Sequence, residues 1–373
     1  MKLNPIELFE IFKRNEINFF CGVPDSLLKE FTNIIDKKIS SRNHIVTANE
    51  GNAVGLAAGY HLKTKKIGLV YLQNSGLGNC INPLTSLTDK QVYSIPMILL
   101  IGWRGFPGTT DEPQHLRQGK ILEKQLKLLG IKYLILEKKK ELKKKINALI
   151  SYSSKNNTPV AILVKKNTFT APDYSENKSS FSLSKKDIIE NFIPKVTKKD
   201  TVLCTTGMIS RSVLSFLKKR QISSENFFFN VGAMGHLSSI AFGIALNNKK
   251  NVFCLDGDGS FLMHLGSLGV IGSMRLKNFK YILINNGCHQ SVGGQKTVSL
   301  NINIKKIADG FGFKYYKVSK GKKNLKNKIE KLFFNEQSSF LEILINSKNE
   351  INLPRPSKRL VEYKNDLIKS LQC

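Results

Sequence analysis

Short apolar runs alternate with segments of helical periodicity along the whole chain, and this pattern limits the fold more than any other feature. The runs form two sets, 67–72, 97–101, 131–136 and 159–164, then 201–204, 226–230, 251–255, 279–284 and 338–345. Continuously apolar strands between helices are typical of parallel sheets covered on both faces. A polar, aperiodic segment separates the sets. The sequence therefore predicts an α/β protein with two doubly wound parallel-sheet domains, 1–170 and 185–373, joined by a linker at 171–184.

The formal net charge of +30, from 58 basic and 28 acidic residues, raises the question of a nucleic-acid partner. Only 9 of the basic residues are Arg, the side chain that reads bases and phosphates best. The densest Lys run, 137–149, has one apolar helical stripe, which is typical of a solvated helix face. A basic nucleic-acid-binding protein remains a remote alternative, whereas a positive field also attracts a small anionic substrate.

Cysteine usage and hydropathy indicate a cytoplasmic protein without a membrane segment. No stretch reaches the roughly 18 apolar residues that span a bilayer. The first 15 residues form an amphipathic pattern of mixed charge, which differs from a signal peptide. The six cysteines contain no C-x-x-C pair and lie in apolar surroundings, as expected for reduced core residues.

Two strand ends in the second half carry oxygen-bearing side chains. The run at 251–255 leads into Asp256-Gly257-Asp258-Gly259, and about 25 residues later the next run ends in Asn285-Asn286-Gly287. Ligands of open parallel sheets bind beyond the carboxyl ends of the strands, and Mg²⁺ prefers such oxygens. A helix predicted at 261–275 would also direct free N–H groups at a phosphate from near Ser260.

The same pattern is compared with two alternatives, a calcium-binding loop and a pair of simple turns. An EF-hand loop would require Gly and Glu where the chain has Phe261 and Ser267, so it is excluded. Each stretch could also be a simple turn, since Asp, Asn and Gly favour turn geometry. Their combination on consecutive strands favours the metal site.

The G-D-G and N-N pair at this spacing resembles the signature of thiamine-diphosphate-dependent enzymes. The resemblance implies a thiamine-diphosphate-binding fold with a pyrimidine-binding domain followed by a diphosphate-binding domain, without the middle domain of many relatives. It implies that Mg²⁺ is bound by the side chains of Asp258 and Asn286 and by the backbone carbonyl of Cys288. The cofactor's diphosphate would lie against Gly257, Asp258, Gly259, Ser260 and Asn286. The family builds its sites between subunits, so a homodimer or larger homo-oligomer is implied.

Two further segments match this family. Glu50 opens a helix rich in small residues at 47–60, and the resemblance implies that it is the acid beside the cofactor's pyrimidine ring. In 230–246, it implies that the carbonyl of Gly232 accepts from the 4′-amino group and that Met234 lies between the two rings. Taken alone, Glu50 could stabilise a helix N-terminus and Met234 could fill a core gap.

Three stretches resemble the compact decarboxylases of this family: 21–31, 102–120 and 285–297. The resemblance implies decarboxylation of a small anionic 2-oxo acid, 3-phosphonopyruvate to phosphonoacetaldehyde and CO2 in phosphonate biosynthesis, with sulfopyruvate or another 2-oxo acid as the alternative. Asp25 and His115 are candidates for proton transfer. Donors for the substrate's anionic groups would be Ser26, Arg104, Arg117, His289 and Ser291. The segment 102–120 lacks periodicity and is expected to be an exposed loop, whose charges could also be only solvated surface.

Overall fold

The structure is a computed structural model that describes residues 2–137, 141–170, 181–348, 353–354 and 358–372. Its contacts divide the chain into two compact units. Unit 1 comprises Met1–Ser175 and His289–Gln295, and unit 2 comprises Glu176–Cys288 and Lys296–Cys373. Of the predicted linker, residues 171–180 lie outside the described part.

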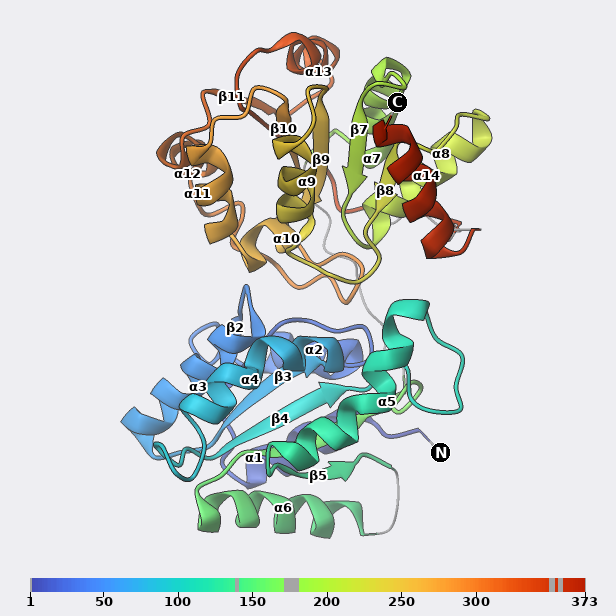
Figure 1. The fold of residues 1–373 in the computed structure, drawn as a ribbon. Helices are drawn as coiled ribbons and strands as arrows, with labels where there is room; N and C mark the ends of the chain where they lie inside the picture. The colour runs from blue at the N-terminus through green and yellow to red at the C-terminus, as the bar shows by residue number, and fades with distance from the viewer. Residues whose placement is uncertain (1, 138–140, 171–180, 349–352, 355–357, 373) are drawn as a thin grey trace. The chain divides into compact units, whose positions relative to one another are not determined.

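Unit 1 is built on a six-stranded parallel sheet in the order β2-β1-β3-β4-β6-β5 (Figure 1). Its strands are β1 (Phe20–Gly22), β2 (His44–Val46), β3 (Gly68–Gln73), β4 (Met97–Gly102), β5 (Lys132–Ile135) and β6 (Val160–Val164). Its helices are α1 (Pro5–Arg14), α2 (Lys29–Lys38), α3 (Glu50–Thr64), the 3₁₀ turn η1 (Asn74–Gly76), α4 (Leu77–Ser86), α5 (Pro113–Leu128) and α6 (Leu142–Asn156).

Unit 2 repeats this plan with a parallel sheet in the order β11-β12-β10-β9-β7-β8. Its strands are β7 (Thr201–Cys204), β8 (Phe227–Phe229), β9 (Val252–Gly257), β10 (Phe279–Asn285), β11 (Tyr315–Ser319) and β12 (Ser339–Leu344). Its helices are α7 (Lys185–Phe192), the 3₁₀ turn η2 (Ile193–Lys195), α8 (Met208–Lys219), α9 (Leu237–Leu246), α10 (Asp258–Met263), α11 (Gly266–Ser273), α12 (Ile304–Phe311), α13 (Leu325–Phe334) and α14 (Leu360–Gln372).

Each sheet is buried on both faces, which explains why its strands are continuously apolar. Along β3, Leu69 and Tyr71 join the cluster under α1, α2 and α6, whereas Val70 and Leu72 join the cluster under α3, α4 and α5. In unit 2, α7, α8, α13 and α14 cover one face and α9, α11 and α12 the other. The predicted α/β class with two doubly wound parallel sheets is confirmed.

The nine predicted strands are all present, but three short ones were not among them: β1, β2 and β11. Two other predictions are wrong. The segment 102–120 is not a continuous loop, because α5 begins at Pro113. The leucine in its first turns, Leu116, is exposed, and its buried leucines, Leu122 and Leu126, lie beyond residue 120. The predicted helix 261–275 begins earlier, at Asp258, and is interrupted at His264 and Leu265, where glycine-rich α11 starts afresh.

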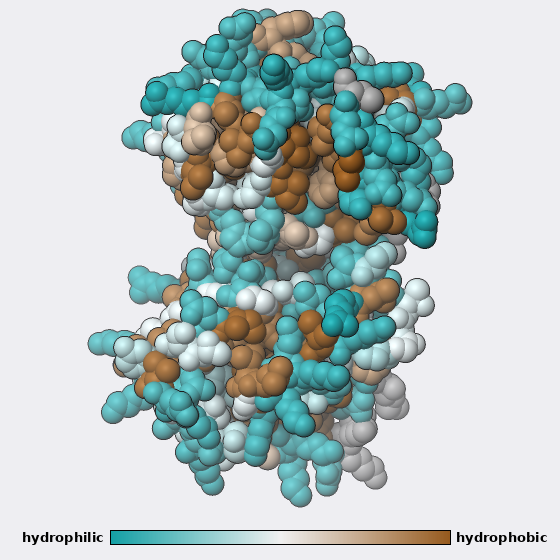
Figure 2. Space-filling view, in the orientation of Figure 1, coloured by the Kyte–Doolittle hydropathy of each residue, from teal (hydrophilic) through white to brown (hydrophobic). Residues whose placement is uncertain are grey.

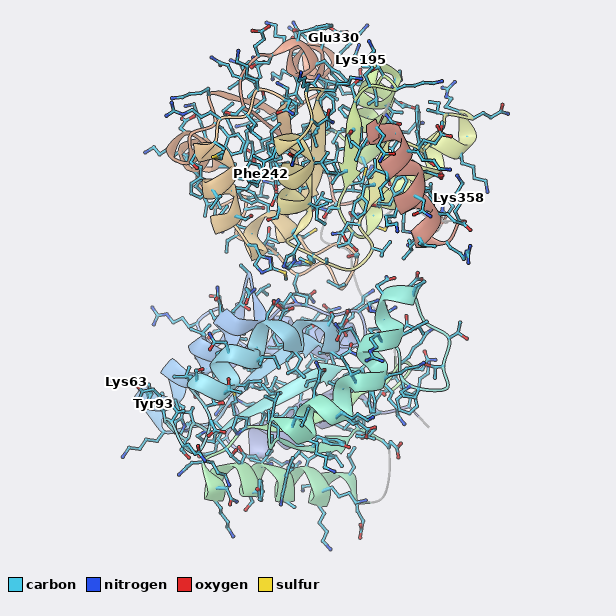
Figure 3. All side chains as sticks on the ribbon, viewed as in Figure 1. Lys63, Tyr93, Lys195, Phe242, Glu330 and Lys358 are labelled. Carbon is cyan, nitrogen blue, oxygen red and sulfur yellow. The ribbon has the colours of Figure 1, made fainter. Side chains whose placement is uncertain are left out.

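Lysines lie on the outer surface of both units, with Lys185 and Lys280 of unit 2 as buried exceptions. Figure 3 shows Lys63 of unit 1 and Lys195 and Lys358 of unit 2 at the periphery, the latter two paired with Glu330 and Asp366. Such pairs are solvated and contribute little to stability. Among the described residues, no helix combines the length and the apolar character needed to cross a membrane.

Candidate functional site

In each unit one candidate carboxylate follows the carboxyl end of a strand at the topological switch point, where ligands of doubly wound sheets bind. In unit 1 the chain leaves β1 toward β2 on one side and later adds β3 on the other, so the switch point lies between β1 and β3. Asp25 follows β1 and Gln73 ends β3. In unit 2 the switch point lies between β7 and β9, and Asp258 follows β9.

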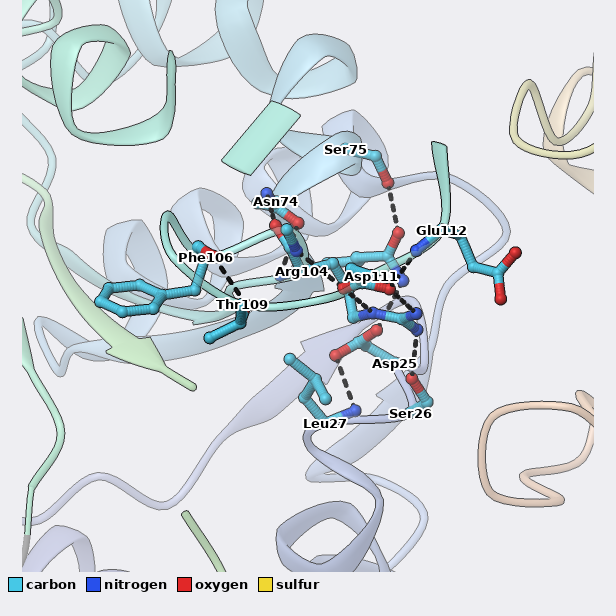
Figure 4. Close-up of polar contacts among 12 residues, drawn as sticks. Asp25, Ser26, Leu27, Asn74, Ser75, Arg104, Phe106, Thr109, Asp111 and Glu112 are labelled. Atoms are coloured by element: carbon cyan, nitrogen blue, oxygen red, sulfur yellow. Dashed lines mark hydrogen bonds and ion pairs between the residues drawn. The ribbon is translucent and has the colours of Figure 1, made fainter. Parts of the chain in front are cut away.

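Asp25 is a fully buried carboxyl at the unit 1 edge (Figure 4). Its Oδ1 accepts from Gln73 Nε2 at 2.6 Å, and its Oδ2 accepts from the Leu27 N–H at 3.0 Å. Burial raises the pKa of Asp25, although these hydrogen bonds and the charge of Arg104 oppose the rise. A Cβ at Gly102 would lie 2.0 Å from Asp25 Oδ2, so the strand end next to it must be glycine. The surroundings thus hold an acid that can keep its proton more readily than an exposed Asp.

Arg104 lies beside this acid, and its guanidinium forms a bidentate ion pair with Asp111. Nε donates to Asp111 Oδ2 at 2.9 Å and Nη2 donates to Oδ1 at 2.5 Å, while Nη1 donates to Ser26 Oγ at 3.1 Å. The hydrogen bonds with Asp111 raise the pKa of Arg104. Burial alone would raise the pKa of Asp111, but Arg104 and two backbone N–H groups hold it well below its ordinary value. Both groups are therefore charged at neutral pH.

Glu50 is the first residue of α3 and is 5% exposed. Asn49 caps the helix by accepting from the Gly51 N–H at 2.8 Å, so the Glu50 carboxyl does not make the N-cap hydrogen bond. Its Oε2 accepts from Asn79 Nδ2 at 2.7 Å. Burial raises the pKa of Glu50, and the bond from Asn79 opposes the rise. The reading of Glu50 as a mere helix stabiliser does not account for its burial against Asn79.

The turn between β3 and α4 contacts all three of these groups. Gln73 donates to Asp25, and Ser75 Oγ donates to Gln73 Oε1 at 2.8 Å. Asn74 exchanges two hydrogen bonds with the backbone of Arg104, at 2.9 and 3.1 Å. Gly76 adjoins the Glu50 carboxyl, and a Cβ there would lie 2.3 Å from Oε1. Sequence reasoning missed this turn, although polar residues follow an apolar strand here as they do at Asp256–Gly259.

His115 and Arg117 lie in the first two turns of α5, not in the exposed loop that was predicted for them. His115 is half-buried, and burial followed by the positive charge of Arg104 lowers its pKa to about 4. A neutral imidazole at physiological pH can accept or donate a proton but adds no positive charge. Arg117 is exposed on the helix.

The unit 2 edge is organised around Asp258, which is 3% exposed. Its Oδ2 accepts from Thr297 Oγ1 at 2.5 Å and from Ser299 Oγ at 3.2 Å. Ser299 Oγ also lies 2.8 Å from Asn285 Oδ1, so its single hydroxyl proton is shared between the two acceptors and links the ends of β9 and β10. Burial raises the pKa of Asp258 to about 6 despite these hydrogen bonds. Thr297 ends the matching stretch 285–297 but was not predicted as a site residue, and Ser299 lies just beyond that stretch.

The next turn carries the other expected ligands. Asn286 Oδ1 accepts from the Cys288 N–H at 3.1 Å, which holds the amide against its own turn. Gly287 has a φ of +70°, and the Thr297 N–H donates to its carbonyl at 2.9 Å. Asn285 Nδ2 donates to Glu342 in the sheet, and Asn285 Oδ1 accepts from the Gly287 N–H at 3.1 Å. Both asparagines therefore hold this turn through their side-chain oxygens, and Asn285 also connects it to the sheet.

The segment around Met234 packs against the start of α10. The Gly235 N–H donates to Ser260 Oγ at 3.0 Å, so Ser260 links the two segments. Met234 is half-buried, and its N–H donates to the Gly232 carbonyl at 2.8 Å. Gly257 caps α10 in an extended conformation, ahead of Asp258 and Gly259 in its first turn. His289 and Ser291 lie in the loop His289–Gln295, where the His289 N–H donates to the Gln295 carbonyl at 2.8 Å.

Comparison with known proteins finds two domains of one enzyme family in the chain. Residues 7–128 match the thiamine pyrophosphate enzyme, N-terminal TPP binding domain, and residues 204–343 match the C-terminal TPP binding domain. A phosphonopyruvate decarboxylase of Streptomyces viridochromogenes is 31% identical over 79% of this chain and 76% of its own. A sulfopyruvate decarboxylase of Methanosarcina acetivorans is 27% identical over 98% of both chains.

A two-subunit relative matches in parts. The sulfopyruvate decarboxylase of Methanocaldococcus jannaschii has a β subunit that is 41% identical over 34% of this chain and 65% of the subunit. Its α subunit is 32% identical over 42% of this chain and 90% of the subunit. Both family domains are present here in one polypeptide, and the chain belongs to the thiamine diphosphate (thiamine pyrophosphate)-dependent decarboxylases, which are carboxy-lyases.

Proposed function

We propose that the protein decarboxylates 3-phosphonopyruvate to phosphonoacetaldehyde and CO2, as a step in phosphonate biosynthesis. The observation that carries this proposal is that a buried acid, Asp25, lies close to the guanidinium of Arg104 at the unit 1 sheet edge. A 2-oxo acid with a second anionic group needs a cationic donor for that group and a proton source for the carbon that loses CO2. The similarity to phosphonopyruvate decarboxylases over most of the chain supports the same substrate.

The donor atoms at the unit 2 edge suit Mg²⁺ and a diphosphate. Asp258 offers a buried carboxylate and Asn286 an amide oxygen, and the carbonyl of Cys288 is in the same turn. These are hard oxygen ligands, and Mg²⁺ completes its shell with phosphate oxygens and water. Gly257, Gly259 and Ser260 would border the diphosphate, and Gly232 and Met234 the aminopyrimidine side. When bound, thiamine diphosphate supplies the electron sink that allows the bond to CO2 to break.

Different residues of the chain would transfer the protons of the reaction and bind the anionic groups of the substrate. Glu50 is buried and shifted toward its protonated form, so its carboxyl can exchange a proton with the pyrimidine ring in a dry site. Asp25, also shifted toward its protonated form, is suited to deliver a proton to the product carbon. His115 is neutral, so it can relay a proton by accepting one on one ring nitrogen and releasing one from the other, close to Arg104 and Asp111. Ser26, Arg104, His289 and Ser291 would hold the anionic groups, and Arg117 would act only as an exposed charge on α5.

Sulfopyruvate is the alternative substrate, favoured by the relative that aligns over 98% of both chains. A dianionic phosphonate requires more positive charge than a monoanionic sulfonate. The sequence offers Arg104 and Arg117 for this purpose, but Asp111 neutralises Arg104 and Arg117 is exposed. The structure therefore offers less positive charge for a phosphonate than the sequence suggests, and direct competition between the two substrates decides between them.

We further propose a homo-oligomer with sites between subunits. Figure 2 shows apolar residues gathered where α9 and α11 cover unit 2, and Val270 and Met274 there are 62% and 53% exposed. On α3, Leu56 and Leu62 are exposed, and the exposed Gly55 and Gly59 have open space above them. Such faces are suited to close helix packing with a second copy. The α and β subunits of the related sulfopyruvate decarboxylase support an assembled enzyme.

We also propose a cytoplasmic location, and we disfavour nucleic-acid binding. All five cysteines of the described residues are free thiols and four are buried, which favours a reducing compartment such as the cytoplasm. Nucleic-acid binding is the disfavoured alternative, because the lysines are dispersed over both units. A gel shift that survives moderate salt and depends on sequence would support it.

Steady-state kinetics of the purified protein with thiamine diphosphate and Mg²⁺ test the proposed function. Phosphonopyruvate, sulfopyruvate and pyruvate should be compared side by side for CO2 release. We expect the highest kcat/KM for phosphonopyruvate. A higher value for sulfopyruvate would assign the alternative, and release of CO2 from none of them would refute the proposal.

A further inference from the structure

The hydrogen bonds of Arg104 leave a defined edge of its guanidinium available. Of the five N–H groups of an arginine side chain, Asp111 takes one on Nε and one on Nη2, and Ser26 takes one on Nη1. One N–H on each terminal nitrogen remains, with no acceptor among the described residues. The side chain is 20% exposed, so this edge is reachable. Two N–H groups on neighbouring nitrogens match the oxygens of a phosphonate or a sulfonate.

Asp111 is itself rigidly held. Its Oδ2 also accepts from the Gly105 N–H at 2.8 Å, and its Oδ1 also accepts from the Glu112 N–H at 2.8 Å. Its side chain is only 10% exposed, so water screens its charge poorly. With four donors on two oxygens, the carboxylate fixes the plane of the guanidinium and remains ionised beside it.

We propose that Asp111 is a specificity-determining residue, which orients Arg104 and cancels its charge so that the terminal group of the substrate meets a hydrogen-bonding edge of nearly zero net charge. This inference rests on the proposed function, because it assumes that Arg104 contacts that terminal group. Its consequence is discrimination by charge. Asp111 repels a dianionic terminal group about twice as strongly as a monoanionic one, whereas its orienting effect is the same for both.

The Asp111→Asn variant separates these two effects. Loss of orientation should lower kcat/KM for phosphonopyruvate and for sulfopyruvate alike. Loss of the negative charge should favour the dianion. At about pH 8, where a phosphoryl-type group has lost its second proton, the ratio of the two kcat/KM values should shift toward phosphonopyruvate by roughly tenfold.

Two matched variants control this experiment. Ser26→Ala removes the other hydrogen bond of Arg104 without a change of charge, so it should raise both KM values and leave the ratio unchanged. Glu137→Gln removes a negative charge from the half-exposed pair with Lys165 in the same unit, and should change neither value. An unchanged ratio in Asp111→Asn, with both kcat/KM values reduced or not, would overturn the inference.

A binding measurement keeps this test independent of turnover. Calorimetry of the holoenzyme with phosphonoacetate and with sulfoacetate, which carry the same two terminal groups, gives the ratio of dissociation constants. We expect Asp111→Asn to shift this ratio toward phosphonoacetate by about the same factor. An unshifted ratio overturns the role of Asp111 even if the wild-type enzyme is active. A shifted ratio in a protein that releases no CO2 from either 2-oxo acid leaves the inference standing and refutes the proposed reaction.

Discussion

Replacement of Gly76 by Ala is the most direct test of the Glu50 site, because it moves the carboxyl without altering it. Gly76 lies at the start of α4 with φ −71° and ψ −13°, a conformation that Ala adopts without strain. A Cβ there would lie 2.3 Å from Glu50 Oε1, 2.5 Å from Cδ and 2.7 Å from Cγ. The whole carboxyl group therefore blocks the added methyl.

The size of the effect follows from these distances. The carboxyl must retreat by about 1 Å to reach ordinary contact with the methyl. A shift of that size breaks the 2.7 Å hydrogen bond from Asn79, and misplacement of a reacting group by about 1 Å costs roughly 100-fold in rate. Forcing a methyl into a packed site costs about 1–3 kcal/mol of folding stability, which leaves a domain of this size folded. We expect kcat to fall by about two orders of magnitude, with a loss of only a few degrees in Tm.

Gly78→Ala is the matched control, since it makes the same substitution two residues away where nothing lies within 4 Å of the new Cβ. It should keep wild-type kcat and gain up to about 1 kcal/mol from helix propensity. CO2 release, thermal unfolding and thiamine diphosphate binding should be measured for both variants. A Gly76→Ala enzyme with normal kcat would refute the reasoning, because it would mean that the position of the Glu50 carboxyl does not matter to the reaction.

Three further predictions concern single side chains. Glu50→Gln should retain thiamine diphosphate, measured by calorimetry, but lose turnover because its amide holds no transferable proton; near-normal CO2 release would contradict this. The pKa of His115 falls from 6.5 to about 4 on folding, so the unfolded chain takes up this proton first and stability is lost as pH drops from about 6.5 toward 4. His115→Gln should therefore lose less Tm than wild type between about pH 7 and pH 5, and equal losses would count against the burial effect. Ser299→Ala should weaken Mn²⁺ binding by about 10–100-fold, measured by electron paramagnetic resonance, because Asp258 loses a hydrogen-bond donor that orients it. Ser273→Ala is the control and should not weaken Mn²⁺ binding, because this hydroxyl donates within α11. Equal Mn²⁺ affinities in the two variants would exclude an orienting role for Ser299.

Local patterns in the sequence were sufficient for the fold and for part of the site. Parallel strands buried on both faces leave continuous apolar runs, which is why nine strands could be located in advance. Strand ends and helix starts have their own residue preferences, so Glu50, Asp258 and Asn286 could be placed on the correct elements. The three missed strands are short or half-exposed: β1 and β2 have three residues each, and β11 has only one buried position, Ser319.

The partners of these residues were decided by the tertiary structure alone. Gln73 reaches Asp25 across 48 residues, and Ser299 reaches Asp258 across 41. Neighbouring strands of a parallel sheet bring such residues together, but strand order is set by the packing of helices on both faces and not by any local signal. The same holds for Arg104, which looked like a free cation in the sequence and is neutralised by Asp111 in the fold. A sequence states which chemical groups a chain carries, whereas burial and long-range neighbours decide their charge, orientation and proton affinity.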